Sequence, residues 1–539
     1  MYQQVKASVN WNYKIIVTNV KSGESLCYSL ALLKGCISCD NSQECLNNNV
    51  QNVITVRHYV DSTEQETEWP VVDYQFKCVV NLNRGANEII LKYVNVQQIC
   101  KLEFKPRRTA YRVMPVYIIC RGHNGRFHAP ETEENSVQSA CKRIAVGAKV
   151  IQCVAAEKLH EAGFCRKAFQ LENDLNSQAA ECTVFYSRLH VDAARKMKPG
   201  DLWEYFAREL MTSSLGNADR KFLAFLSCTY YKKCEEKPQS HEKMLAQLEA
   251  HVALGGGGLA IFGTACLHTW PQDIKEILPR FLNTTIVDSR YFMDDSCYRG
   301  TYGACFATTL GSVCHELGHT FDLGHTETGI MGRGFDNINL VFTLQPKRNR
   351  IESTGRGLCG NRGGADKGDV RQATVCFTKV LSLSYSVQGA TKPGTKNRGD
   401  DKMARLLRNG GQEIAPVIKC DEYSTTRDSL DSDMTYWGTS CATLLAFHRW
   451  FNTEVPRSGS GKISFDETRN AVSSDAGLSV VELRDGTGLV RGSWQFPGAP
   501  RTSVFRVPAR EPLPATLVAQ DRVGNILKQH LGPAGPTSA

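Results

Sequence analysis

The segment Cys314–His325 places the strongest constraint on the fold of this chain, because its histidines can bind one metal ion only if the fold brings their side chains together. His315 and His319 are four residues apart, so on an α-helix both imidazoles lie on the same face. Glu316 adjoins the first histidine and would lie beside an ion held by the pair. This His-Glu-x-x-His spacing is typical of zinc hydrolases, in which the glutamate holds a water molecule. The segment therefore predicts a helix, one Zn²⁺ cofactor and Glu316 as the catalytic base.

A third ligand is predicted at His325, ten residues after the first histidine. A catalytic zinc usually has three protein ligands and keeps one position for water. Gly324 precedes His325, and we expect it to adopt a positive φ, end the helix and turn the chain back. Met331 follows shortly afterwards and predicts a Met-turn that packs beneath the metal. The predicted metal ligands are therefore His315, His319 and His325.

Asp322 departs from the longer form of this motif, in which glycine stands seven residues after the first histidine. Its carboxylate could accept a hydrogen bond from a histidine N–H and so orient that ring. It could equally be an ordinary polar residue at the end of a helix. The sequence leaves both interpretations open, and the turn into His325 is expected to differ from the usual one.

The length of 539 residues is enough for about two to four domains. Hydrophobic residues make up 42% and charged residues 22%, which is typical of a globular protein with a large core. Composition and periodicity change along the chain and predict an α+β / α/β multidomain protein. The expected parts are a β-rich, sandwich-like N-terminal domain over residues 1–110, a zinc peptidase core over 111–345, a basic glycine-rich insertion over 346–433, a helical return to the core over 434–475, and a small β-rich C-terminal unit with a tail over 476–539.

Inside the predicted core, a strand followed by a long helix indicates an α/β layer. Compact apolar runs predict strands at residues 114–120, 183–186, 222–226 and 259–263. Apolar residues at helical spacing predict helices over 135–162 and 242–254, and a further helix over 439–451. In the C-terminal unit, strands are expected over 479–483 and 503–507.

The net charge of +9 comes from one segment. Residues 347–410 hold 14 Lys and Arg against 5 Asp and Glu, which accounts for the whole excess, so the rest of the chain is neutral. No apolar run in the sequence approaches the roughly 20 residues of a membrane span. The first residues lack the pattern of a secretory signal, and the 21 cysteines then favour reduced thiols and a cytoplasmic location.

Several blocks outside the zinc motif give the chain a family resemblance. They lie at residues 116–119, 125–131, 155–169, 251–254, 267–271, 329–335 and 445–451, the last of which reads Leu445-Ala446-Phe447-His448-Arg449-Trp450-Phe451. Together with the zinc motif, they resemble the Metallopep family of zinc metallopeptidases, which occurs widely in fungi and invertebrates. The resemblance runs over residues 10–345 and 435–490 and leaves out the basic insertion. It implies a metzincin-like core and a zinc-dependent peptidase that acts on a peptide or protein substrate.

The main hypothesis is a metalloendopeptidase in which zinc and Glu316 activate water against a peptide bond. Residues 255–258, a run of four glycines, and the strand at 259–263 could position a substrate by strand pairing, or they could be plain sheet core. One alternative is a non-catalytic zinc-containing binding or scaffold protein, against which the intact Glu316 argues. Another is a nucleic-acid- or membrane-associated protein that acts through residues 347–410. That segment lacks the interleaved aromatic residues of a single-strand binding surface, so nucleic acid is not the expected partner.

Overall fold

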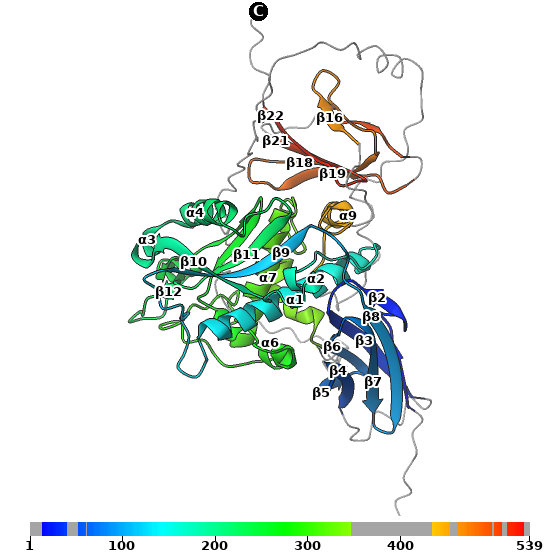
Figure 1. Cartoon of the computed structure of the whole chain (residues 1–539), viewed down its shortest axis with the longest axis vertical. Helices are drawn as coiled ribbons and strands as arrows, with labels where there is room; N and C mark the ends of the chain where they lie inside the picture. The colour runs from blue at the N-terminus through cyan, green and yellow to red at the C-terminus, as the bar shows by residue number, and fades with distance from the viewer. Residues whose placement is uncertain are drawn as a thin grey trace, which may run out of the picture. The chain divides into compact units, whose positions relative to one another are not determined.

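The computed structural model describes residues 13–39, 52–60, 62–345, 434–452, 461–498, 501–508 and 515–532. The basic insertion predicted over 346–433 lies outside these residues. The described residues belong to two compact units (Figure 1). Unit 1 holds residues 13–345, 434–438 and 448–452, and unit 2 holds residues 439–447 and those from 461 onward.

Eight strands at the start of unit 1 form one sheet in the order β1-β3-β6-β5-β4-β7-β8-β2. Their bounds are Tyr13–Val17 (β1), Glu24–Leu26 (β2), Leu30–Cys39 (β3), Val53–Val60 (β4), Thr63–Val72 (β5), Gln75–Asn81 (β6), Gly85–Tyr93 (β7) and Val96–Phe104 (β8). β5 joins the two halves, because it pairs with β4 along most of its length and with β6 at its end. The sheet folds over on itself, so the ring of Tyr13 in β1 packs edge-on against Tyr93 in β7, with 5.3 Å between ring centroids. Alternate residues of β4, such as Ile54 and Val56, point into the resulting core, as the two-residue period of a strand requires.

A buried ion pair joins these strands to the rest of unit 1. The carboxylate of Glu157, on the long helix α1 (Val137–Glu161), accepts hydrogen bonds from the Tyr28 hydroxyl at 2.8 Å and from Arg166 Nε at 2.7 Å. The Arg166 guanidinium also donates to Glu24 of β2 at 2.6 Å. Glu157 is 2% exposed, so these bonds replace the water that its charge loses on burial.

The core of unit 1 is built on a five-stranded sheet in the order β10-β9-β11-β15-β14. These strands span Arg112–Arg121 (β9), Thr183–His190 (β10), Arg220–Leu226 (β11), Ala253–Gly256 (β14) and Leu259–Gly263 (β15). The first four in this order are parallel, whereas β14 pairs antiparallel with β15 at the edge. The four strands predicted from apolar runs are confirmed. The central ones are apolar throughout because a parallel sheet is covered on both faces.

Helices cover both faces of this sheet (Figure 1). On one face, α3 (Val191–Lys196) packs Ala194, and α4 (Pro199–Thr212) packs Leu202 and Phe206, against alternate residues of β9, β11 and β15. On the other face lie α1 and α7 (Tyr302–Thr320). There, Phe225 of β11 contacts Trp270, which in turn packs on Phe306 of α7. Unit 1 therefore has a three-layer α/β/α core.

Shorter elements connect these layers. They are α2 (Glu172–Leu175), β12 (Tyr230–Tyr231), α5 (His241–Leu245), β13 (Leu248–Glu249), α6 (Ile277–Phe281) and the 3-10 turns η2 (Leu267–Thr269), η3 (Ile274–Glu276) and η4 (Gly334–Val341). The helix predicted over 135–162 is confirmed as α1, but the helix predicted over 242–254 is wrong. α5 covers only its start, and β13 and β14 follow. Tertiary pairing of β14 with β15 overrides the local helical preference of this short segment.

Unit 2 is an antiparallel β structure with one described helix, α9 (Thr439–Phe447). Its strands form two sheets, in the orders β16-β17-β20 and β19-β18-β21-β22. Their bounds are Ile463–Asp466 (β16), Ala471–Ser474 (β17), Leu478–Arg484 (β18), Val490–Gln495 (β19), Val504–Arg506 (β20), Ala515–Asp521 (β21) and Ile526–Leu531 (β22). Val472, Val481 and Leu517 lie in its core. The predicted strands at 479–483 and 503–507 correspond to β18 and β20, and the helix predicted over 439–451 ends at Phe447.

The mixed α/β, multidomain fold class predicted from the sequence is confirmed by these two units. Among the helices that the structure describes, none combines the length and the apolar character needed to cross a membrane.

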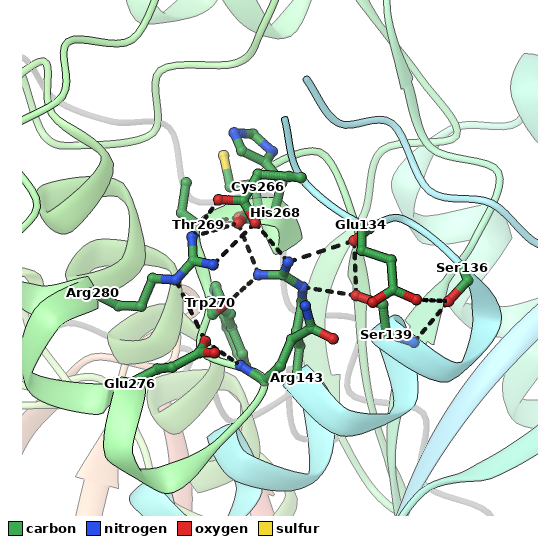
Figure 2. A network of polar contacts seen from close by, with 12 residues as sticks. Glu134, Ser136, Ser139, Arg143, Cys266, His268, Thr269, Trp270, Glu276 and Arg280 are labelled. Atoms are coloured by element: carbon green, nitrogen blue, oxygen red, sulfur yellow. Dashed lines mark hydrogen bonds and ion pairs between the residues drawn. The ribbon is translucent and has the colours of Figure 1, made fainter. Parts of the chain in front are cut away.

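The guanidinium of Arg143 fixes the loop that follows β15 (Figure 2). It is fully buried and donates to the backbone carbonyls of His268, at 2.9 Å, and Trp270. The carboxylate of Glu133 balances its charge at 2.7 Å, and the Ser139 hydroxyl accepts from its Nε at 3.1 Å. The His268 ring is buried beside this network, and burial lowers the pKa of its imidazole to about 3.

We predict that His268 makes unit 1 sensitive to acid. In the unfolded chain the imidazole takes up a proton near its ordinary pKa of about 6.5, whereas in the folded protein it does so near 3. The unfolded state binds the extra proton between these values. The contribution of His268 to stability is therefore complete above about pH 6.5, and it falls by up to about 1.4 kcal/mol per pH unit as the pH drops toward 3. His268→Phe should reduce this fall, measured as the loss of urea-unfolding free energy between about pH 7 and about pH 4.5.

His160→Phe, at the exposed end of α1, is the matched control and should leave the acid sensitivity of the wild type unchanged. Equal losses of unfolding free energy in the wild type and His268→Phe would contradict the prediction.

Candidate metal centre

Helix α7 carries two of the predicted ligands, and a third lies just beyond its end. Thr301 caps the helix by accepting a hydrogen bond from its first turn. The Nε2 atoms of His315 and His319 are 3.2 Å apart, and Nε2 of His325 lies 3.1 Å from that of His319. A tetrahedral zinc ion with bonds of about 2.0–2.1 Å places its ligand atoms about 3.3 Å apart. The structure thus brings together the three residues that the sequence predicts as ligands, at a spacing that fits one ion.

Backbone carbonyls orient two of these rings. Nδ1 of His315 lies 2.8 Å from the carbonyl oxygen of Ile330, and Nδ1 of His319 lies 2.9 Å from that of Leu323. Because a carbonyl oxygen can only accept, each Nδ1 donates and each Nε2 keeps its lone pair for a metal. Burial also lowers the pKa of His315 to about 4, which favours the neutral imidazole that a metal requires.

The chain reverses after α7 at Asp322, which adopts a left-handed backbone conformation with φ of 66°. The N–H of Asp322 donates to the carbonyl of His319 at 3.1 Å, and that of Leu323 donates to the carbonyl of Gly318 at 3.3 Å. This pair of bonds is the Schellman motif, in which the left-handed residue follows the helix cap. The prediction that Gly324 supplies the positive φ is therefore wrong. Aspartate can take the place of glycine here because it is one of the few other residues that adopt the left-handed conformation.

Asp322 also contacts a histidine from a distant part of the sequence. Nε2 of His448 lies 3.2 Å from Oδ2 of Asp322, and the two residues are 126 positions apart. Asp322 thus lies at the end of the helix, as one of the two interpretations left open by the sequence has it, and its histidine partner is not one of the predicted ligands. Spacing along the chain gave no reason to connect His448 with the metal centre, although it lies in one of the blocks that carry the family resemblance.

Met331 lies beneath α7 at Gly318. A Cβ at Gly318 would lie 2.8 Å from Sδ of Met331, so the methionine can approach this closely only because the helix has glycine there. Gly329, with φ of 75°, begins the turn, and the N–H of Thr326 donates to the carbonyl of Met331 at 3.0 Å to close it. Met331 is 1% exposed and fills the space under the helix.

Glu316 meets the edge strand β14. The N–H of Gly255 donates to the Glu316 carboxylate and lowers its pKa, whereas burial of the carboxylate raises that pKa. Burial is the larger effect and raises the pKa of Glu316 to about 8. A Cβ at Gly255 would lie only 1.8 Å from the backbone oxygen of Glu316, so β14 touches α7 backbone to backbone.

The strand that could pair with a substrate is β14, whereas for the strand at 259–263 the structure favours sheet core, the other of the two interpretations left open. That strand, β15, lies between β11 and β14, so both of its edges are already paired. Within the described ranges, no strand pairs with the outer edge of β14. The glycines Gly255 and Gly256 of the predicted run lie in β14 itself.

A small cavity opens beside α7, one turn before the predicted ligands. Thr309, Ser312 and Val313 of α7 line one side of it, and its volume of about 50 Å³ has room for a few water molecules. His251 and Asp295 add polar groups to walls that are otherwise largely apolar. Burial lowers the pKa of His251 to about 4 and raises that of Asp295. The sequence gave no signal for Asp295.

Comparison with known proteins gives the family. The Metallopep family model, described as "Putative peptidase family", matches residues 14–414. The chain belongs to the Metallopep family. This match confirms the family inferred from the sequence, but its extent differs, because the match runs on to residue 414, inside the predicted insertion, and does not include residues 435–490.

Two curated relatives of this Metallopep protein carry the name "Putative zinc metalloproteinase". The one from Schizosaccharomyces pombe is 24% identical over 344 residues, which cover 62% of this chain and 54% of the relative. The one from Saccharomyces cerevisiae is 24% identical over 315 residues, which cover 53% of this chain and 44% of the relative. The chain spans about half the length of these relatives.

Among solved structures, this chain is similar to catalytically inactive OgpA from Akkermansia muciniphila, crystallised in complex with an O-glycopeptide substrate. The similarity covers 79% of this chain and 93% of the OgpA chain. The TM-score is 0.37 and the sequence identity is 12%.

We predict that Gly255 tolerates no side chain, whereas its neighbour Gly256 does. The methyl group of Gly255→Ala would collide with backbone atoms of Glu316, so β14 or α7 must move. We expect a loss of about 1–3 kcal/mol of unfolding free energy, typical of overpacking. In Gly256→Ala the nearest atom, on Trp203, is 3.8 Å away, so this matched variant should unfold close to the wild-type Tm. Equal Tm values for the two variants would contradict the backbone contact.

Proposed function

We propose that this Metallopep protein is a zinc-dependent endopeptidase, with His315, His319 and His325 holding one Zn²⁺ and Glu316 acting as general base. The observation that carries the proposal is the convergence of the three Nε2 atoms, 3.1 and 3.2 Å apart, one residue from a carboxylate held against the edge strand. A bound zinc ion would lower the pKa of a water molecule from about 15.7 toward about 7 and polarise the substrate carbonyl.

Glu316 moves the proton in this mechanism. Its carboxylate takes a proton from the attacking water and delivers it to the leaving amine. The N–H of Gly255 supports this role, because a hydrogen bond from rigid backbone keeps the carboxylate in one orientation.

We propose that the substrate is an extended peptide that pairs with the outer edge of β14. Backbone N–H and C=O groups at an unpaired strand edge bind another strand by the same hydrogen bonds as a sheet. Such pairing lets both ends of the peptide run past the metal centre, which favours cleavage within a chain over removal of terminal residues. The cavity beside Ser312 would receive a substrate side chain. The proposed compartment is the cytoplasm, where the free thiols of the described cysteines would persist.

A non-catalytic scaffold protein fits this arrangement less well. A structural zinc site needs no carboxylate beside its ligands, whereas Glu316 is present and hydrogen-bonded. The alternative that acts through residues 347–410 concerns a segment outside the described residues.

The ligand set predicts the metal content. Wild-type protein should bind one zinc ion per chain, and His325→Ala should lower that content, because two histidines leave the ion incompletely held. Metal analysis of the purified proteins by mass spectrometry checks this. His160→Ala, at the exposed end of α1, serves as the control and should retain full zinc. Full zinc in His325→Ala would mean that another residue is the third ligand.

If Glu316 is the general base, replacing it should lower peptide cleavage and leave zinc binding unchanged. Glu316→Gln removes the proton acceptor and keeps the shape of the side chain, so zinc content should stay at one per chain. Peptide cleavage should fall about 100- to 10,000-fold, the usual contribution of general acid–base catalysis. Cleavage of a peptide library by the wild type and the variant, with zinc content measured on the same samples, tests this. Unchanged cleavage would exclude Glu316 as the base.

A further inference from the structure

The turn at Asp322 carries two of the contacts on which the metal centre depends. Leu323, the next residue, supplies the carbonyl that orients His319, at 2.9 Å from Nδ1. Two residues further on comes His325, whose Nε2 lies 3.1 Å from that of His319. A change in the backbone of Asp322 would therefore displace both the third ligand and the group that aims the second.

Asp322 adopts a conformation that its side chain makes costly. With φ of 66°, its Cβ lies close to the following carbonyl, a strain that glycine avoids. The longer zinc motif has glycine at this position, so aspartate carries a strain there that a contact of its side chain can offset. The carboxylate provides that contact, because it reaches Nε2 of His448 at 3.2 Å.

The protonation of His448 suits this contact. The backbone N–H of Trp450 donates to Nδ1 of His448 at 3.4 Å, so Nδ1 acts as the acceptor. In a neutral imidazole the proton then resides on Nε2, which donates to the acceptor-only carboxylate of Asp322. His448 is 2% exposed, so water competes little for this bond.

Packing also fixes the position of His448. Its ring packs against Phe321 and Trp450, with 5.6 and 5.5 Å between centroids. The Nζ atom of Lys221, on β11, lies 4.2 Å from the centre of the Trp450 ring. The Arg107 guanidinium, at the start of the core, donates to the carbonyl of Trp450 at 3.0 Å. His448 is thus held by packing and by contacts outside the turn, in addition to its contact with Asp322.

We propose that His448 is a positioning residue of the metal centre, which holds Asp322 in its left-handed conformation and thereby sets the third ligand and the orientation of the second. The proposal rests on the proposed zinc site. It assigns to His448 a role in metal affinity that goes beyond packing in the core.

The test is the zinc affinity of the purified full-length chain, measured by competition with a chromophoric chelator. His448→Phe keeps a ring against Phe321 and Trp450 but removes the donor. We expect it to bind zinc more weakly than the wild type, by up to the roughly 10- to 100-fold that follows the loss of a hydrogen-bond partner of a ligand itself. Asp322→Gly in the same chain should return the affinity to within about threefold of the wild type, because glycine takes the left-handed conformation without an anchor.

A merely structural role for His448 gives a different result. His58→Phe, a buried histidine of β4, is the matched control for the substitution and should bind zinc as the wild type does. If His448→Phe binds zinc as tightly as the wild type, or if Asp322→Gly fails to restore affinity in the double variant, the proposal is wrong. If the wild type itself binds no zinc, the proposed function fails instead, so the two failures can be told apart.

Discussion

Three imidazole nitrogens that lie 3.1 and 3.2 Å from their neighbours can come from one short segment only if a helix ends abruptly and reverses. The reversal has to occur between His319 and His325, and one left-handed residue, Asp322, provides it. The Schellman bonds close the end of the helix, and the carbonyl of Leu323 then turns back toward His319. The other features of the site, from the Met331 turn to the edge strand, are arranged around this geometry.

Close backbone contacts keep α7 in place. Gly255 lets β14 touch the helix at Glu316, Gly311 lets Phe335 approach it, and Gly318 admits Met331 beneath the ligands. A Cβ at any of these positions would lie under 3.0 Å from a neighbouring atom. Glycine lowers helix propensity, so Gly311 and Gly318 make the helix locally less stable. The close contacts that these glycines and Gly255 allow fix the distance from the helix to the strand and the turn.

The sequence predicted the features that depend on periodicity and on ligand spacing. The α7 segment was recognisable because His315 and His319 need a helix, and the strands of the parallel sheet were recognisable as short apolar runs. The sequence did not predict where the helix reverses, because glycine at position 324 matched the general preference for a positive φ, whereas Asp322 adopts it. The segment 242–254 was predicted as a helix because its apolar spacing fits one, whereas pairing with β15 decides its conformation. His448 could not be connected with Asp322 from spacing, because the contact joins residues 126 positions apart. The zinc, its three ligands and the role of Glu316 remain predictions that the geometry supports.

The bond between Arg107 and the carbonyl of Trp450 joins residues 343 positions apart. One lies where the core begins and the other lies in its last described segment, so the core is closed by contacts between its two ends. During synthesis on the ribosome, α7 and its three histidines therefore emerge well before the segment that packs behind them. A chain that stops before residue 448 would carry the whole zinc motif without the donor that faces Asp322. The core is thus completed late in synthesis, and a truncated product would have an incomplete core.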